Sequence, residues 1–202
     1  MNDIERAISD ISDIRSRLAA STHFRGYAPE AVAVIGLVSL AVMLAQIAWP
    51  DRLGAGNADI ALVWAAVLVA SGLTVHGEAV SRSRRQHGGM ARAMLSGAMR
   101  AAMPIAFVGV VAGASVLAFA PGAAWLLPGM WQMLVGVAVF SSYATMPRGI
   151  AWPAAWLLGC GGLVTVLSGM SGEITPLMAG GPFVPAYLVI AWLLHREGNQ
   201  VE

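Results

Sequence analysis

The chain alternates between long apolar stretches and short polar connections, a pattern that is typical of membrane-spanning helices. A transmembrane helix needs about 20 predominantly apolar residues. Six such stretches are predicted as spans, over 29–49, 59–77, 101–119, 129–145, 152–169 and 182–194, of which the last is the shortest. The pattern predicts an all-α polytopic membrane protein, with a six-helix transmembrane domain over 29–196 and a short cytoplasmic tail over 197–202.

The first 28 residues have a different period and predict an amphipathic helix outside the membrane, followed by a connector. Its apolar positions recur at spacings of three and four, which places them on one helical face. They are Ile4, Ala7, Ile11, Ile14 and Leu18. The other faces carry four acids and three arginines, whereas helices that lie on anionic lipid are usually rich in Lys and Arg. The apolar face is therefore expected to contact protein.

The arginines divide unevenly between the two ends of the predicted spans. Arg52 alone lies in an odd-numbered connection, and the other arginines precede the first span, follow the sixth or lie in even-numbered connections. Positively charged residues near span ends are retained in the cytoplasm. The distribution predicts that both termini are cytoplasmic. Abundant Ala and Gly with arginine in place of lysine suggest a GC-rich bacterial genome. The membrane is therefore expected to be the bacterial inner membrane.

Composition narrows the class of protein further. The chain is 57% hydrophobic and 11% charged, against about 25% charged residues in soluble domains. The spans leave no room for a separate soluble domain, and the arginines have a topological explanation, so no nucleic-acid partner is expected. No Ser-His-Asp or Cys-His grouping lies on one side of the membrane, so no catalytic residue is predicted. The chain is expected to be non-enzymatic.

Two histidines are the only candidates for holding a cofactor. His76 ends the second span and His195 ends the sixth, so both are predicted at the cytoplasmic interface. Two histidines at one depth could bind a b-type haem through its axial positions. Haem ligands in helical bundles usually lie deeper, and no bound metal or cofactor is expected. A haem- or quinone-binding redox subunit stays an alternative.

Small residues predict close helix packing. Gly109 and Gly113 form a small-xxx-small pattern in the third span, and Gly159 and Gly162 interrupt the bulky side chains of the fifth. Such surfaces let helices approach closely, within one chain or between copies. If these surfaces pack between copies, the protein is expected to form a homo-oligomer.

No acidic or basic residue and no histidine falls in the central third of any span, which argues against an ion-coupled transporter. The mildly polar residues within the spans are expected to serve packing. As an alternative function, a small oligomeric transporter or channel for an uncharged or lipid-like solute would have a cavity near the midplane. Its expected lining is Gln46, Ser141, Ser142 and Tyr143.

The favoured function is that of an accessory or regulatory subunit that acts through its cytoplasmic face. Asp10 and Asp13 of the N-terminal helix have opposite charge to an arginine-rich connection. That connection contains Arg82, Arg84 and Arg85. Opposite charges at short range attract, although each exposed pair contributes only about 0–1 kcal/mol. The N-terminal helix is expected to dock there, in its own chain or a second copy, or to be displaced by a partner.

Overall fold

The computed structural model describes residues 28–86, 91–143 and 146–198, and all regular structure in these ranges is helical. The four longest single helices are α2 (Pro29–Ala48), α4 (Asn57–Gln86), α5 (Ala91–Phe119) and α7 (Ala151–Ser171). The remaining α-helices are α3 (Pro50–Leu53), α6 (Leu127–Ser141), α8 (Pro176–Gly180) and α9 (Phe183–Gly198). Two 3₁₀ helices, η2 (Pro121–Leu126) and η4 (Arg148–Ile150), lead into α6 and α7.

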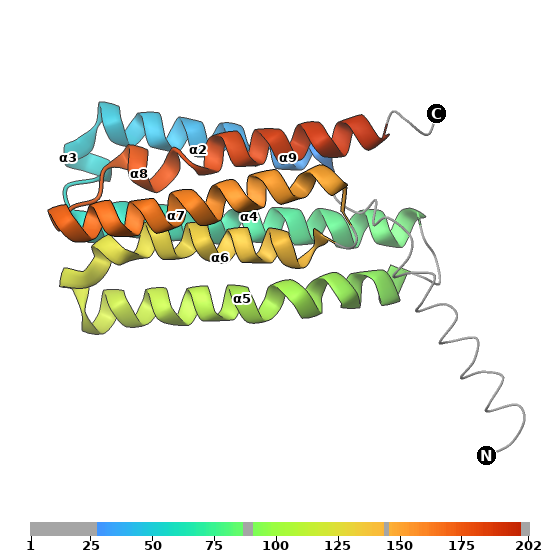
Figure 1. The fold of residues 1–202 in the computed structure, drawn as a ribbon, viewed down its shortest axis with the longest axis horizontal. Helices are drawn as coiled ribbons and strands as arrows, with labels where there is room; N and C mark the ends of the chain where they lie inside the picture. The colour runs from blue at the N-terminus through green and yellow to red at the C-terminus, as the bar shows by residue number, and fades with distance from the viewer. Residues whose placement is uncertain (1–27, 87–90, 144–145, 199–202) are drawn as a thin grey trace, which may run out of the picture.

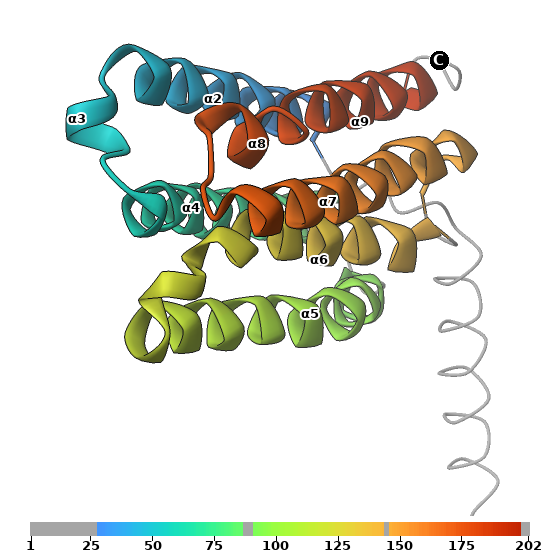
Figure 2. The same cartoon turned by 60° about the vertical axis from the view of Figure 1, so that its left-hand side comes forward.

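The long helices lie side by side as a bundle (Figure 1). The helices α2 and α9 contact each other along one edge, α6 and α7 form the centre, and α5 lies at the opposite edge against α4 and α6. Figure 2 shows the short helix α8 between α2 and α7, in line with the start of α9. The bundle therefore has a central pair of helices with further helices packed around it.

Six segments of the described chain are long and apolar enough to cross a membrane. They are Pro29–Ala48, Asn57–Glu78, Ala102–Phe119, Pro121–Ser141, Ala151–Ser171 and Pro176–Glu197. Between 11% and 39% of each apolar window is buried inside the protein, so most of its apolar surface faces outward. In water this surface would be unfavourable, whereas in a bilayer it meets hydrocarbon. The protein is an integral membrane protein that contacts lipid.

Glycines allow the central helices α6 and α7 to approach each other closely. A Cβ atom added to Gly161 of α7 would lie 2.7 Å from the carbonyl oxygen of Gly129 on α6. The same addition at Gly129 would collide with the hydroxyl of Thr165, and at Gly136 it would lie 3.0 Å from the carbonyl oxygen of Ala154. Small residues at such contacts let helix backbones pack against each other in membranes. This interface defines the centre of the bundle.

Several helix boundaries differ from those expected from the sequence. The helix α4 continues through the connection predicted after residue 77 and ends at Gln86. The connection predicted over 121–128 is helical, and α6 ends at Ser141 instead of reaching residue 145. The last span begins at Pro176, before the predicted residue 182, and is interrupted. The predicted amphipathic helix, with Ile4, Asp10, Asp13 and its other residues, lies outside the described residues.

Candidate functional site

The interruption in the sixth span is the most unusual part of the described structure. Between α8 and α9, Gly181 and Pro182 form a turn. Pro182 has no N–H to donate to the carbonyl of Met178, one turn earlier. Gln132 of α6 replaces this donor: its Nε2 donates to the Met178 oxygen at 2.8 Å and to the Ala179 oxygen at 3.3 Å. Within the bilayer core no water can satisfy such carbonyls, so the fully buried Gln132 side chain stabilises the interruption.

On its other side, the interruption rests on the indole of Trp64. A Cβ atom at Gly180 would collide with this ring, so the turn requires glycine there. Trp64 Nε1 donates to Gln46 Oε1 at 2.9 Å, and Gln46 Nε2 donates to the Leu53 carbonyl at 2.9 Å. Trp64 also stacks on Phe183, with 5.9 Å between ring centroids. These contacts connect the start of α9 with α2 and α4.

The loop before α8 is held from α4. Asn57 Nδ2 donates to the Gly172 carbonyl at 2.7 Å, and Asn57 Oδ1 accepts from the Ile174 N–H at 2.9 Å. Gly172 has a φ of 72°, which ends α7 in the left-handed conformation that glycine adopts readily. The Thr175 side chain accepts from the Met178 N–H and caps α8. Both ends of α8 are therefore fixed by specific hydrogen bonds.

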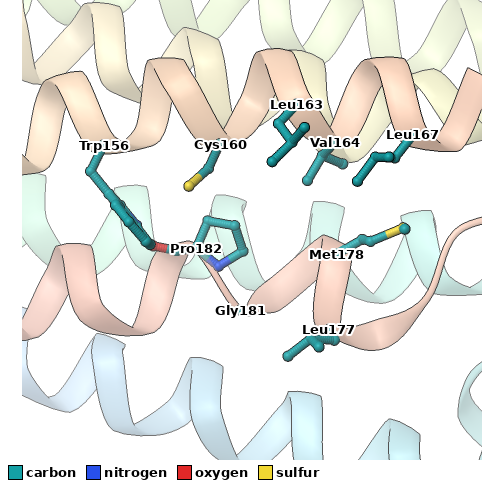
Figure 3. Close-up of a pocket in the computed structure, with 9 residues that line it drawn as sticks. All are labelled: Trp156, Cys160, Leu163, Val164, Leu167, Leu177, Met178, Gly181 and Pro182. Carbon is teal, nitrogen blue, oxygen red and sulfur yellow. The ribbon is translucent and has the colours of Figure 1, made fainter.

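An apolar groove of about 300 Å³ lies between α7 and the interruption (Figure 3). We call it the α7 groove. Its walls are Trp156, Cys160, Leu163, Val164 and Leu167 from α7, and Leu177, Met178, Gly181 and Pro182 from the opposite side. Trp156 Nε1 donates to the Pro182 carbonyl at 3.0 Å, which ties the two walls together at one end. The groove opens on the outer surface of the bundle.

The glycines predicted to mediate packing fall into two groups. Gly109 and Gly113 of α5 face Trp131 of α6, which donates from Nε1 to the Gly109 carbonyl at 3.1 Å. Gly159 and Gly162 have open space where a Cβ would lie, so they make no close contact with the other residues that the structure describes. Neighbouring Gly161 makes the close contact of α7 instead.

The two candidate haem ligands lie on α4 and α9. His76 Nδ1 is 2.8 Å from the carbonyl oxygen of Gly72 in its own helix, and His195 is exposed on α9. The helix α9 packs mainly on α2 and α7, whereas α4 packs mainly on α5 and α2. Among the described residues no three His, Cys, Asp or Glu side chains are grouped so that they could hold a metal ion. A haem-binding subunit stays an alternative to the expectation that no cofactor is bound.

The four residues expected to line a transport cavity do not lie together. Gln46 is near the end of α2 that joins α3, where it bonds Trp64. Ser141, Ser142 and Tyr143 are at the end of α6, at the opposite end of the bundle (Figure 1). Ser141 donates to the Val137 carbonyl in its own helix at 2.8 Å. These residues form no shared lining.

The arginine-rich segment is helical where the sequence predicted a polar connection. The apolar part of α4 ends at Glu78 and that of α5 begins at Ala102, so residues 79–86 and 91–101 extend both helices beyond their spans. At 1.5 Å per residue the extensions measure about 12 Å and 16 Å. Figure 1 shows both helices reaching past the nearby ends of α6 and α7. Arg82, Arg84 and Arg85 are in the α4 extension.

Gln132 and Trp156 donate hydrogen bonds to backbone carbonyls at the interruption, and neither was among the predicted site residues. The Gly180-Gly181-Pro182 sequence could have indicated them, because it predicts an interrupted helix whose carbonyls need hydrogen-bond donors from other helices. The partner that supplies a donor depends on how the helices pack, which the sequence pattern does not specify. In comparisons with protein-family models, curated proteins and solved structures, nothing matches the chain.

Proposed function

We propose that the protein is a non-enzymatic subunit of the bacterial inner membrane that works by protein contact at its arginine-rich end. The observation that carries this proposal is the extension of α4 and α5 beyond their apolar spans, at the same end of the bundle. We call residues 79–86 and 91–101 the arginine extensions. They provide a helical surface outside the hydrocarbon.

The length of the arginine extensions favours a protein partner. The polar headgroup layers add about 10–15 Å in total to a hydrocarbon core of about 30 Å, so each layer is about 5–8 Å thick. Extensions of about 12 Å and 16 Å reach through that layer into water if they run near the membrane normal. Residues there are available to a partner in the aqueous phase.

Charge indicates the chemistry of the partner. The segment 79–101 contains five arginines and no acidic residue. Arg82, Arg84 and Arg85 are in the first extension, and Arg92 and Arg100 are in the second. Arginine binds carboxylates through two parallel hydrogen bonds. The expected partner surface is acidic, and Asp10 and Asp13 near the N-terminus offer one within the same chain or a second copy.

The proposal is tested by photo-crosslinking in native membranes, with a photoreactive amino acid at Gln86 of the full chain. We expect one discrete product, which persists when Arg82, Arg84 and Arg85 are all replaced by Lys and is lost when all three are replaced by Glu. Mass spectrometry of the product then distinguishes the protein's own N-terminal segment, a second copy and another protein. If no discrete protein product forms, or if the Glu variant retains it, the proposal is wrong.

A further inference from the structure

We propose that the α7 groove binds one acyl chain of a bilayer lipid. The argument depends on the shape and surroundings of the groove, and it is independent of the function proposed for the arginine extensions.

The interruption in the sixth span creates the groove. A continuous helix would present side chains along the whole face opposite α7, whereas the turn at Gly181 and Pro182 leaves backbone there with little side chain (Figure 3). Pro185 adds to this effect, because it offers no N–H to the Gly181 carbonyl one turn earlier. The hollow is therefore a property of the backbone path and not of one small side chain.

Hydrogen bonds on three sides hold this backbone path in place. Gln132 binds the Met178 carbonyl from the bundle interior, Trp156 binds the Pro182 carbonyl across the groove, and Asn57 holds the preceding loop. Binding sites for small molecules are usually largely formed before the ligand arrives, which lowers the entropy lost on binding. The α7 groove meets that condition.

The lining selects a hydrocarbon chain. Apart from the Cys160 thiol, the side chains of the groove are aliphatic, thioether or aromatic. The one strong donor among them, the Trp156 N–H, is already bonded to the protein. A polar or charged ligand would lose its hydration without gaining partners, whereas a hydrocarbon chain has no such cost. Recognition therefore depends on apolar contact.

The position of the groove identifies the source of the chain. Leu163 and Leu177 on its two walls are 58% and 63% exposed, so the groove is continuous with the apolar surface that contacts the bilayer. Lipid chains can enter sideways without crossing water. The surrounding medium supplies the ligand at high concentration.

The dimensions suit a single chain. From Trp156 to Leu167 the groove follows α7 over eleven residue-to-residue steps, or about 16 Å at 1.5 Å per step. This length is about that of one acyl chain, since two leaflets make up the hydrocarbon core of about 30 Å, and the groove is centred on the middle of the span Ala151–Ser171. The volume of about 300 Å³ is at the lower end of the 300–1,000 Å³ typical of ligand pockets. A narrow chain fits this space better than a broad ring system.

Cys160 makes the test direct, because it is the chain's single cysteine and it lines the groove. Full-length protein is reconstituted in bilayers that contain a phosphatidylcholine with a diazirine on one acyl chain, then illuminated and digested. We expect adducts to concentrate on Trp156–Leu167 and on Leu177 and Met178. Prior reaction of Cys160 with benzyl methanethiosulfonate, which fills the groove, should lower these adducts several-fold, and reduction of the mixed disulfide should restore them.

The matched control carries Cys160→Ala and Val166→Cys. Val166 is on the same helix and 59% exposed, but it does not line the groove. Benzyl modification there should leave the adducts unchanged. The proposal is overturned if adducts spread evenly over exposed apolar residues such as Phe107 and Trp192, or if modification at both positions has the same effect. A disulfide between Cys160 residues of two copies in native bilayers would also overturn it, because a second copy would then cover the groove.

Discussion

At the scale of single residues, Gln132 supplies the hydrogen bond that Pro182 cannot donate to the Met178 carbonyl, while Gln132 Oε1 is buried with no hydrogen-bond partner in the described structure. The proline removes one backbone donor and the glutamine supplies another from a different helix. The sequence showed a polar residue in a span and a proline in another, but not that they are partners. They are separated by 50 residues, and only the packing of α6 against α8 brings them together.

Replacing Gln132 by Met keeps the size of the side chain and removes the donor to the Met178 and Ala179 carbonyls. We expect the free energy of unfolding to fall by about 1 kcal/mol, since side-chain hydrogen bonds in membranes contribute about 0.6–1.7 kcal/mol and a buried unpaired acceptor costs about 1–3 kcal/mol. The loss is partly offset because Met also removes Gln132 Oε1, which is buried with no hydrogen-bond partner in the described structure. Unfolding in mixed micelles of increasing SDS content measures the change. Ser141→Ala, which removes a bond within one exposed turn, is the control and should change stability by less than about 0.5 kcal/mol. Equal effects would contradict the assigned role of Gln132.

A pair of glycine substitutions tests the contact between the interruption and Trp64. In Gly180→Ala the new Cβ collides with the buried indole, and overpacking of this kind costs about 1–3 kcal/mol. In Gly159→Ala the Cβ enters open space, and alanine in a helix is favoured over glycine by about 0.5–1 kcal/mol. Thermal unfolding in detergent should show opposite signs for the two variants. Two variants of equal stability would show that Gly180 does not approach Trp64 closely.

At the scale of elements, hydropathy predicted six apolar spans, and the described part of the chain contains six. Their ends were less predictable for identifiable reasons. The sixth span was predicted to begin at Pro182, because proline is favoured at the first position of a helix. Pro176 is at the first position of α8, so the span begins there instead. The segment from Arg82 to Gln86 is polar, yet it contains no glycine or proline to end the helix, and α4 continues through it. The short segments α8 and η2 depend on tertiary contacts that periodicity does not contain.

The connection between α4 and the loop before α8 gives a prediction at this scale. Asn57→Ala removes both hydrogen bonds to the loop, so the Ile174 amide should exchange with solvent deuterium much faster than in the native protein. Asn57→Asp keeps an acceptor for the Ile174 N–H and loses the donor to the Gly172 carbonyl. It should have an intermediate effect. Hydrogen exchange read by mass spectrometry on the peptide that contains Gly172 and Ile174 makes the comparison. Protection that is unchanged in both variants would show that other contacts hold the loop.

At the scale of the whole molecule, the two ends of the bundle have different designs. One end carries the arginine extensions and the last turn of α9, where His195 and Arg196 are exposed. The other end holds α3, η2 and the loop before α8, where hydrogen bonds from Gln46 and Asn57 fix short segments. The α7 groove opens beside the interruption, away from the arginine extensions. The two proposals therefore concern separate surfaces and can fail independently.

The arginine distribution predicts which end faces the cytoplasm, and accessibility to thiol reagents tests it. In a Cys160→Ala background, Arg84→Cys is placed on the α4 extension and Glu173→Cys on the exposed loop at the other end. Since positive charge near span ends is retained in the cytoplasm, a membrane-impermeant maleimide should label Cys at position 173 in intact cells. It should label Cys at position 84 only after the inner membrane is opened. The reverse pattern would place the arginine extensions outside the cell, and the proposed cytoplasmic partner would then be excluded. Labelling at both positions in intact cells would indicate a mixed orientation, which a fixed charge asymmetry does not allow.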